Sequence, residues 1–345
     1  MCAMERATFL RGLTLLAAEG ALGTTAARAQ TPPSGKPFRV DVHHHLMPPF
    51  FAEAVKPRRT GSIFNGWTPE RSLADMDKAG VATALLSMPR TPSVFFGGVE
   101  TSRQLARRVN EYAAGLRGAY PGRFGFWAEM PLPDVEGSIR EAQYALDTLG
   151  ADGIVMATSY GNHWLGDPVF APLWEELNRR KAVVFTHPLS NTCCVNQLAG
   201  LNDNMIEFGT DTTRTIASLV FSGTASRYPD VRIIFSHAGG TMPFLIERFE
   251  FQARDPKLAA AIPHGVDYEL KKFYYDTAQS STPEAMGALM RLVPSSHVLF
   301  GTDFPYRFSS ENVKGLAGCS LRAGDLQAIG RQNALALLPR YRGAT

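Results

Sequence analysis

Short apolar runs alternate with amphipathic stretches along nearly the whole chain, and this regular alternation limits the fold more than any other feature. Several runs are almost continuously apolar, which is typical of strands covered on both faces in a parallel sheet. Eight runs are expected to form strands: Phe38–His43, Val81–Ser87, Phe124–Glu129, Gly153–Ala157, Ala182–His187, Val231–His237, Phe273–Asp276 and Val298–Asp303. The stretches between them are expected to form helices: Pro69–Lys78, Ser102–Arg117, Val135–Leu149, Pro168–Arg180, Asp211–Ser222, Met242–Gln252, Pro283–Leu292 and Ala323–Leu338. Eight strands, each followed by a helix, predict an α/β fold of the (β/α)8 TIM-barrel type rather than an open sheet.

The bulk composition agrees with one barrel of ordinary globular character. The chain has 345 residues, of which 45% are hydrophobic and 19% charged, so a core of normal size can form. The formal net charge is only +3, and no run of lysine and arginine is long enough to make a basic stripe. Nucleic acid is therefore excluded as a partner, and a small molecule is the expected ligand.

The first 29 residues differ from the rest of the chain. A short basic start is followed by the largely apolar stretch Gly12–Leu22 and by the A-x-A pattern Ala27-Arg28-Ala29. This layout predicts a secretory signal peptide that is cut before Gln30, and thus a periplasmic or secreted protein. The apolar stretch is too short for a stable membrane span. A later translation start at Met4 and a cytoplasmic location form the alternative.

The predicted organisation thus has three parts. Residues 1–29 are the signal peptide, residues 30–36 are a linker rich in proline, glycine and serine, and residues 37–345 are the barrel domain. Four cysteines are present, without a C-x-x-C pair, so a cysteine zinc site is not expected. Adjacent cysteines bridge each other only with strain, so Cys193 and Cys194 are interpreted as free thiols in a loop.

Metal-binding side chains stand at the ends of four predicted strands. His43 and His45 are two residues apart, so they point to the same side of the first strand, toward the mouth of the barrel. His187, His237 and Asp303 end the fifth, sixth and eighth strands. A single buried histidine is more often a satisfied core residue, but several unpaired polar side chains at one end of a barrel would be costly to bury. The pattern therefore predicts a metal site.

This arrangement, H-x-H on strand one, histidines on strands five and six and an aspartate on strand eight, resembles the amidohydrolase superfamily over nearly the whole mature chain. Members with two metals have a carboxylated lysine on strand four. Here strand four, Gly153–Ala157, has no lysine, so the resemblance implies a single metal.

Local stretches narrow the resemblance. Asp41–Pro49, Ser236–Phe244 and Gly301–Pro305 look like the aminocarboxymuconate-semialdehyde decarboxylase branch, which consists mainly of non-oxidative decarboxylases. Trp164–Pro168 and Ile206–Arg214 are similar, more narrowly, to 6-methylsalicylate decarboxylases. The expected activity is therefore decarboxylation of a hydroxylated aromatic acid, 6-methylsalicylate to m-cresol and carbon dioxide first of all.

The resemblance also assigns roles to residues. It implies one divalent metal on four ligands, zinc first and manganese as the alternative: His43, His45, His187 and Asp303. It implies that His237 is catalytic, with Asp303 or His237 as the proton donor. It further implies a homodimer in which Arg248 reaches across to the substrate of the partner.

Other interpretations stay open at this point. The same metal site could hydrolyse a lactone or an amide, and a non-enzymatic metal-binding protein is the third hypothesis. Asp41 could orient a ligand imidazole, or it could pair with a neighbouring strand inside the barrel wall. Glu207 and Arg214 are interpreted as a structural ion pair.

Overall fold

The computed structural model describes residues 38–55, 66–90 and 98–343. The predicted signal peptide and linker lie outside these residues. All of the described residues belong to one compact unit, Lys36–Thr345.

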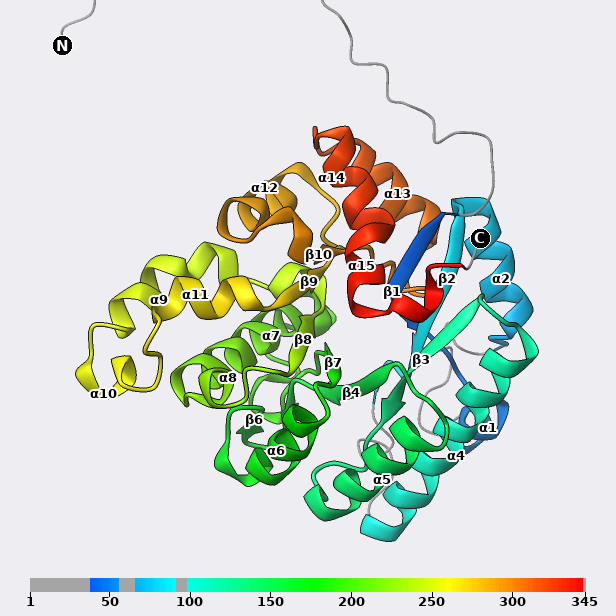
Figure 1. The fold of residues 1–345 in the computed structure, drawn as a ribbon, viewed down its shortest axis with the longest axis horizontal. Helices are drawn as coiled ribbons and strands as arrows, with labels where there is room; N and C mark the ends of the chain where they lie inside the picture. The colour runs from blue at the N-terminus through cyan, green and yellow to red at the C-terminus, as the bar shows by residue number, and fades with distance from the viewer. Residues whose placement is uncertain (1–37, 56–65, 91–97, 344–345) are drawn as a thin grey trace, which may run out of the picture. The chain divides into compact units, whose positions relative to one another are not determined.

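Eight parallel strands form the centre of this unit, and helices surround them (Figure 1). The strands follow one another in chain order as β1 (Arg39–His45), β2 (Val81–Ser87), β3 (Phe124–Glu129), β4 (Gly153–Ala157), β7 (Val183–His187), β8 (Arg232–Phe235), β9 (Tyr274–Asp276) and β10 (Val298–Leu299). The ring is closed between its first and last members, because the amide of Val42 donates to Phe300 O and the amide of Asp303 donates to His43 O. The predicted (β/α)8 TIM barrel is confirmed.

The helices that the structure describes match the predicted ones in place and order. The main outer helices are α2 (Pro69–Ala79), α4 (Val99–Ala119), α5 (Val135–Asp147), α6 (Ala171–Arg179), α7 (Asn204–Phe221), α9 (Ile246–Gln252), α12 (Pro283–Leu292), α14 (Ala323–Gln327) and α15 (Asn333–Leu337). Further elements, which the sequence did not predict, are α1 (Pro49–Val55), α8 (Thr224–Arg227), α10 (Pro256–Ala259), α11 (Gly265–Lys272), α13 (Ser309–Ala317) and a hairpin of β5 (Ser159–Tyr160) and β6 (His163–Trp164). Helix α7 begins seven residues before its predicted start, since the preceding segment of the loop continues the helix.

Capping residues explain why α2 begins at Pro69, as predicted, and ends at Ala79, one residue after its predicted end. The hydroxyl of Thr68 accepts the amide of Arg71 at 3.3 Å and so satisfies a free donor of the first turn. Gly80 ends the helix with φ 64°, a left-handed conformation that glycine adopts without steric cost. Strand β2 follows at once, so the helix packs back on the strand that it precedes.

The hydrophobic core has two parts, and together they show which end of the barrel is open. One fills the space between strands and helices, and the other fills the lumen with side chains such as Val42, Trp127, Val155 and Phe185. Residues after the last helix, among them Tyr341, belong to the lumen cluster. The C-terminal segment therefore covers the N-terminal ends of the strands, and the site lies at their C-terminal ends, as in other barrels of this type.

The structure overturns one prediction about a loop. The prediction of free thiols at Cys193 and Cys194 is wrong, because the two form a disulfide within a short 3-10 turn that brings their side chains together. Cys319 is the free cysteine of the described residues. Within residues 38–343, as far as they are described, no helix is long and apolar enough to cross a membrane.

Candidate metal centre

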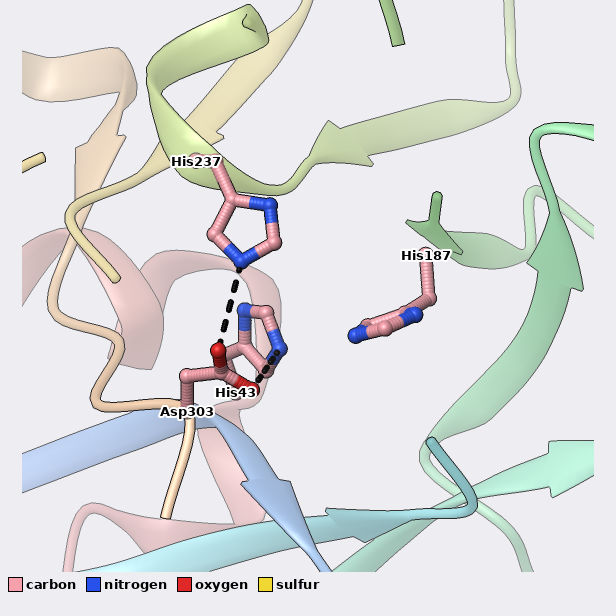
Figure 2. Close-up of side chains that lie close together, drawn as sticks. All are labelled: His43, His187, His237 and Asp303. Carbon is pink, nitrogen blue, oxygen red and sulfur yellow. Dashed lines mark ion pairs between the residues drawn. The ribbon is translucent and has the colours of Figure 1, made fainter. Parts of the chain in front are cut away.

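The predicted metal-binding side chains meet at the open end of the barrel. His43 and His45 come from β1, His187 ends β7, His237 follows β8, and Asp303 follows β10. Figure 2 shows His43, His187, His237 and Asp303 turned toward one shared space. All five side chains are buried, with His237, at 9%, the most exposed of them.

The distances are those of a compact cluster centred on the Asp303 carboxylate. Its Oδ1 lies 2.8 Å from His45 Nε2 and 3.3 Å from His43 Nε2, and its Oδ2 lies 3.5 Å from His237 Nε2. The candidate ligand atoms of His43, His187, His237 and Asp303 all lie within 4.8 Å of one another. The structure thus brings together every metal ligand predicted from the sequence and places His237 equally close to the centre.

A bulge in β1 decides which side chains of this strand face the centre. Between Asp41 and His44, three steps along β1 match two steps along β2, so the simple alternation is broken once. Asp41 consequently pairs with His44 Nδ1 at 3.0 Å and with the Thr302 hydroxyl at 2.6 Å. Two interpretations of Asp41 were open, and the structure supports the second, in which its carboxylate pairs with a neighbouring strand inside the barrel wall.

The place expected for a residue that orients a proposed ligand imidazole is taken by Asp276, to which the sequence alone had not pointed. Asp276 ends β9, and its Oδ2 lies 2.7 Å from His43 Nδ1. His45 Nδ1 lies 3.2 Å from Ser87 O, and His187 Nδ1 lies 3.1 Å from Pro188 O. A polar partner behind each ring turns Nε2 toward the centre, which is how metal-ligating imidazoles are oriented. The rule that found His187, a polar residue ending an apolar strand, would also have found Asp276.

The electrostatics of the cluster suit a cation. Burial would raise the pKa of Asp303, but the charge of His43 and hydrogen bonds from the surrounding imidazoles hold that pKa well below its usual range. Burial lowers the pKa of His45, and burial with the neighbouring imidazoles holds that of His187 well below its usual range. Burial opposes protonation of His43 too, yet the charges of Asp276 and Asp303 raise its pKa to about 10. The cluster therefore attracts positive charge at its centre.

Strained backbone marks the same place. His237, Ala238, Gln279 and Asp303 all have positive φ, between 51° and 63°, in which residues other than glycine are uncommon. Gln279, which the sequence analysis missed, donates a hydrogen bond from Nε2 to Asp303 Oδ2. Such strain persists where the surroundings fix a functional geometry.

The donor set fits one divalent metal. Neutral imidazole nitrogens and a carboxylate are standard ligands for such ions. The Nε2 atom of His237 is buried and has no hydrogen-bond partner among the described residues, as expected where a group outside the chain completes the site. Strand β4 offers no lysine to bridge a second metal.

Two predicted residues lie away from this cluster. Arg248 is exposed on α9 and is not among the clustered side chains. The predicted ion pair of Glu207 and Arg214 is confirmed, with 3.7 Å between Arg214 Nη1 and Glu207 Oε2.

The Amidohydrolase family profile matches residues 40–340 of the sequence. The chain belongs to the amidohydrolase family. The match covers all eight strands apart from the first residue of β1, and thereby every residue of the cluster.

Similar proteins narrow the branch of the family. Decarboxylase yanB of Aspergillus niger is 42% identical over 326 residues, which cover 88% of this chain and 88% of that protein. The 6-methylsalicylic acid decarboxylase acuB of Aspergillus aculeatus is 35% identical, covering 89% of this chain and 98% of that protein. A crystal structure of another amidohydrolase superimposes with a TM-score of 0.80 at 27% identity, covering 87% of this chain and 99% of that one. The resemblance to the decarboxylase branch and the enzyme class, a carboxy-lyase, are confirmed.

Proposed function

We propose that this enzyme removes carbon dioxide from an ortho-hydroxylated aromatic acid, and that 6-methylsalicylate, giving m-cresol, is its substrate. The observation that carries the proposal is the likeness, over most of both chains, to relatives known as 6-methylsalicylic acid decarboxylases. The buried cluster at the mouth of the barrel supplies the polar groups that such an acid needs. Hydrolysis of a lactone or an amide finds no support among these relatives.

The proposed metal ligands are His43, His45, His187 and Asp303. Three imidazoles with one carboxylate favour zinc, and manganese is the alternative that elemental analysis of the purified protein distinguishes. When bound, the metal supplies a Lewis acid that orients the acid's oxygens and offsets negative charge on them. Dialysis against a chelator should abolish activity, and either zinc or manganese should restore it.

The proposed proton donor is the pair formed by His237 and Asp303. The ring carbon that bears the carboxylate accepts a proton from this pair and loses aromaticity. The bond between that carbon and the carboxylate then breaks, its electron pair returns to the ring, and carbon dioxide leaves. One proton from the medium restores the pair for the next cycle, since the phenolic hydroxyl of m-cresol keeps its own proton. His237 Nε2 and Asp303 Oδ2 lie 3.5 Å apart, which is longer than a hydrogen bond, so the two groups share one proton once this contact shortens in the substrate complex.

The decisive experiment is incubation of the metal-loaded protein with 6-methylsalicylate, followed by detection of m-cresol and carbon dioxide. His237→Ala is the matched control: it should keep the metal, measured by elemental analysis, and lose at least about a hundredfold in kcat/KM. Opening of a lactone without decarboxylation would contradict the proposal. Retention of full activity in His237→Ala would contradict the role of His237.

We further propose a homodimer in which Arg248 contacts the substrate of the partner subunit. Its exposure on α9, away from the cluster of its own chain, agrees with this role.

Export before Gln30 stays a prediction, since that segment lies outside the described residues. Mass spectrometry of the protein from its native host should give Gln30 as the first residue, whereas an intact leader would indicate the cytoplasm.

A further inference from the structure

Glu129 is a buried acid at the open end of the barrel that the proposed reaction does not use. It is the last residue of β3 and is only 1% exposed. Side chains alternate along a strand, so Glu129 points to the same side as Trp127, which lies in the lumen and stacks on Phe185. Phe185 in turn contacts the ring of His43, with 5.0 Å between the centroids. Glu129 therefore belongs to the layer of lumen side chains at the mouth.

Only one of its two carboxyl oxygens is satisfied. Oε1 accepts the amide of Met88 at 3.0 Å, whereas Oε2 is buried and has no hydrogen-bond partner among the described residues. An unpaired buried carboxyl oxygen costs about 1–3 kcal/mol and calls for an explanation. His237 Nε2, on the other side of the mouth, also lacks a hydrogen bond, although it lies 3.5 Å from Asp303 Oδ2, and there a ligand is already expected.

A dedicated network holds the backbone of Glu129 in place. Asn110, a fully buried residue of α4, donates to Glu129 O at 3.0 Å and accepts the amide of Glu129 at 2.7 Å. Asn110 also donates to Glu141, which pairs with Arg107. Support of this kind from a rigid helix is typical of side chains that must keep a defined position in a site.

The order of the strands places Glu129 across the mouth from the metal centre. In the closed ring of eight, β3 and β9 are four strands apart in both directions. The clustered side chains come from β1, β7, β8 and β10, with Asp276 of β9 behind them. An aromatic acid whose carboxylate and ortho-hydroxyl face the cluster therefore extends its opposite edge toward β3.

The charge state of Glu129 decides what it can offer to that edge. Burial raises the pKa of Glu129 well above its usual range, and the only hydrogen bond that opposes this shift comes from the amide of Met88. No lysine or arginine of the described residues forms an ion pair with it. Its carboxyl thus keeps its proton to a higher pH than an exposed glutamate does, and in the protonated form Oε2 can donate a hydrogen to an oxygen atom.

We propose that Glu129 is a specificity-determining residue, whose unpaired Oε2 forms a hydrogen bond with an oxygen substituent on the ring edge opposite the carboxylate and ortho-hydroxyl. The preferred substrates are accordingly salicylates with a further oxygen at carbon 4 or carbon 5. This inference rests on the proposed function and refines it, because 6-methylsalicylate carries only hydrogen at both positions.

The test compares three acids as ligands of the metal-loaded protein: 6-methylsalicylate and its 4-hydroxy and 5-hydroxy derivatives. Dissociation constants come from isothermal titration calorimetry and kcat/KM from release of carbon dioxide. The wild type should bind the better hydroxylated acid at least about tenfold more tightly than 6-methylsalicylate. Glu129→Leu should reduce this ratio to about one, while Glu129→Gln, which keeps a neutral donor, should retain most of it.

Glu136→Gln, on the exposed side of α5, is the matched control and should leave the ratio unchanged. If Glu129 had a merely structural role, Glu129→Leu would weaken the binding of all three acids equally, and this outcome would overturn the proposal. Equal binding of the three acids by the wild type, or binding of none, would also overturn it. Absence of turnover with all three acids, with the binding ratio intact and dependent on Glu129, would count against decarboxylation alone.

Discussion

Single residues set the chemistry of the site. Two buried aspartates near β1 have different contacts, and these contacts predict which of the two supports metal binding and which supports folding. Asp276 contacts His43, a proposed metal ligand, whereas Asp41 contacts His44 and Thr302. Asp276→Asn should therefore weaken metal affinity about 10- to 100-fold, because the imidazole loses its anionic partner. Asp41→Asn should lower the midpoint of urea unfolding and leave metal affinity within about threefold of the wild type. Competition with a chelating dye measures both affinities, and equal weakening in the two variants would contradict this division.

A second residue-scale prediction concerns the pH dependence of stability. Below pH 4.5 the Glu129 carboxyl is protonated in both folded and unfolded chains. Its pKa is raised in the folded protein, so above pH 4.5 only the unfolded chain releases the proton, and stability falls as pH rises toward the folded pKa. Glu129→Gln lacks this titration, so its stability relative to the wild type should rise by about 1.4 kcal/mol per pH unit in that window. Urea unfolding of metal-free protein at pH 5, 6 and 7 measures it, and a constant difference would refute it.

At the scale of elements, the loop that carries His237 depends on its close approach to α7. Gly240 has φ 67° and ψ −130°, and a Cβ there would overlap the carbonyl oxygen of Gly209. Gly240→Ala should therefore cost about 3 kcal/mol in unfolding free energy and displace His237, lowering kcat. Gly287→Ala is the control, since this glycine of α12 has open space around it and should gain up to about 1 kcal/mol. Unchanged thermal stability of Gly240→Ala would show that the loop adapts.

The elements also show what a sequence can and cannot reveal. Apolar runs predicted every strand of the barrel, and the amphipathic pattern predicted α2 to within one residue at its end, because these features depend on local periodicity. The bulge in β1 was not predictable, since it arises from the register with β2, and the role of Asp41 was left open as a result. Asp276 and Glu129 also end predicted strands, so the rule that found His187 indicates them as polar strand ends, but their roles depend on which strands face each other across the closed ring.

At the scale of the whole molecule, the proposed homodimer makes a prediction that no monomer can satisfy. If Arg248 serves the site of the partner subunit, each site combines His237 of one subunit with Arg248 of the other. The variants His237→Ala and Arg248→Ala then remove contributions that come from different subunits. Coexpression of the two inactive variants should then restore about a quarter of the wild-type activity, because half of the dimers are mixed and each has one intact site. Native mass spectrometry should detect the mixed dimers. A monomer, or mixed dimers without activity, would contradict the contribution of Arg248 across the interface.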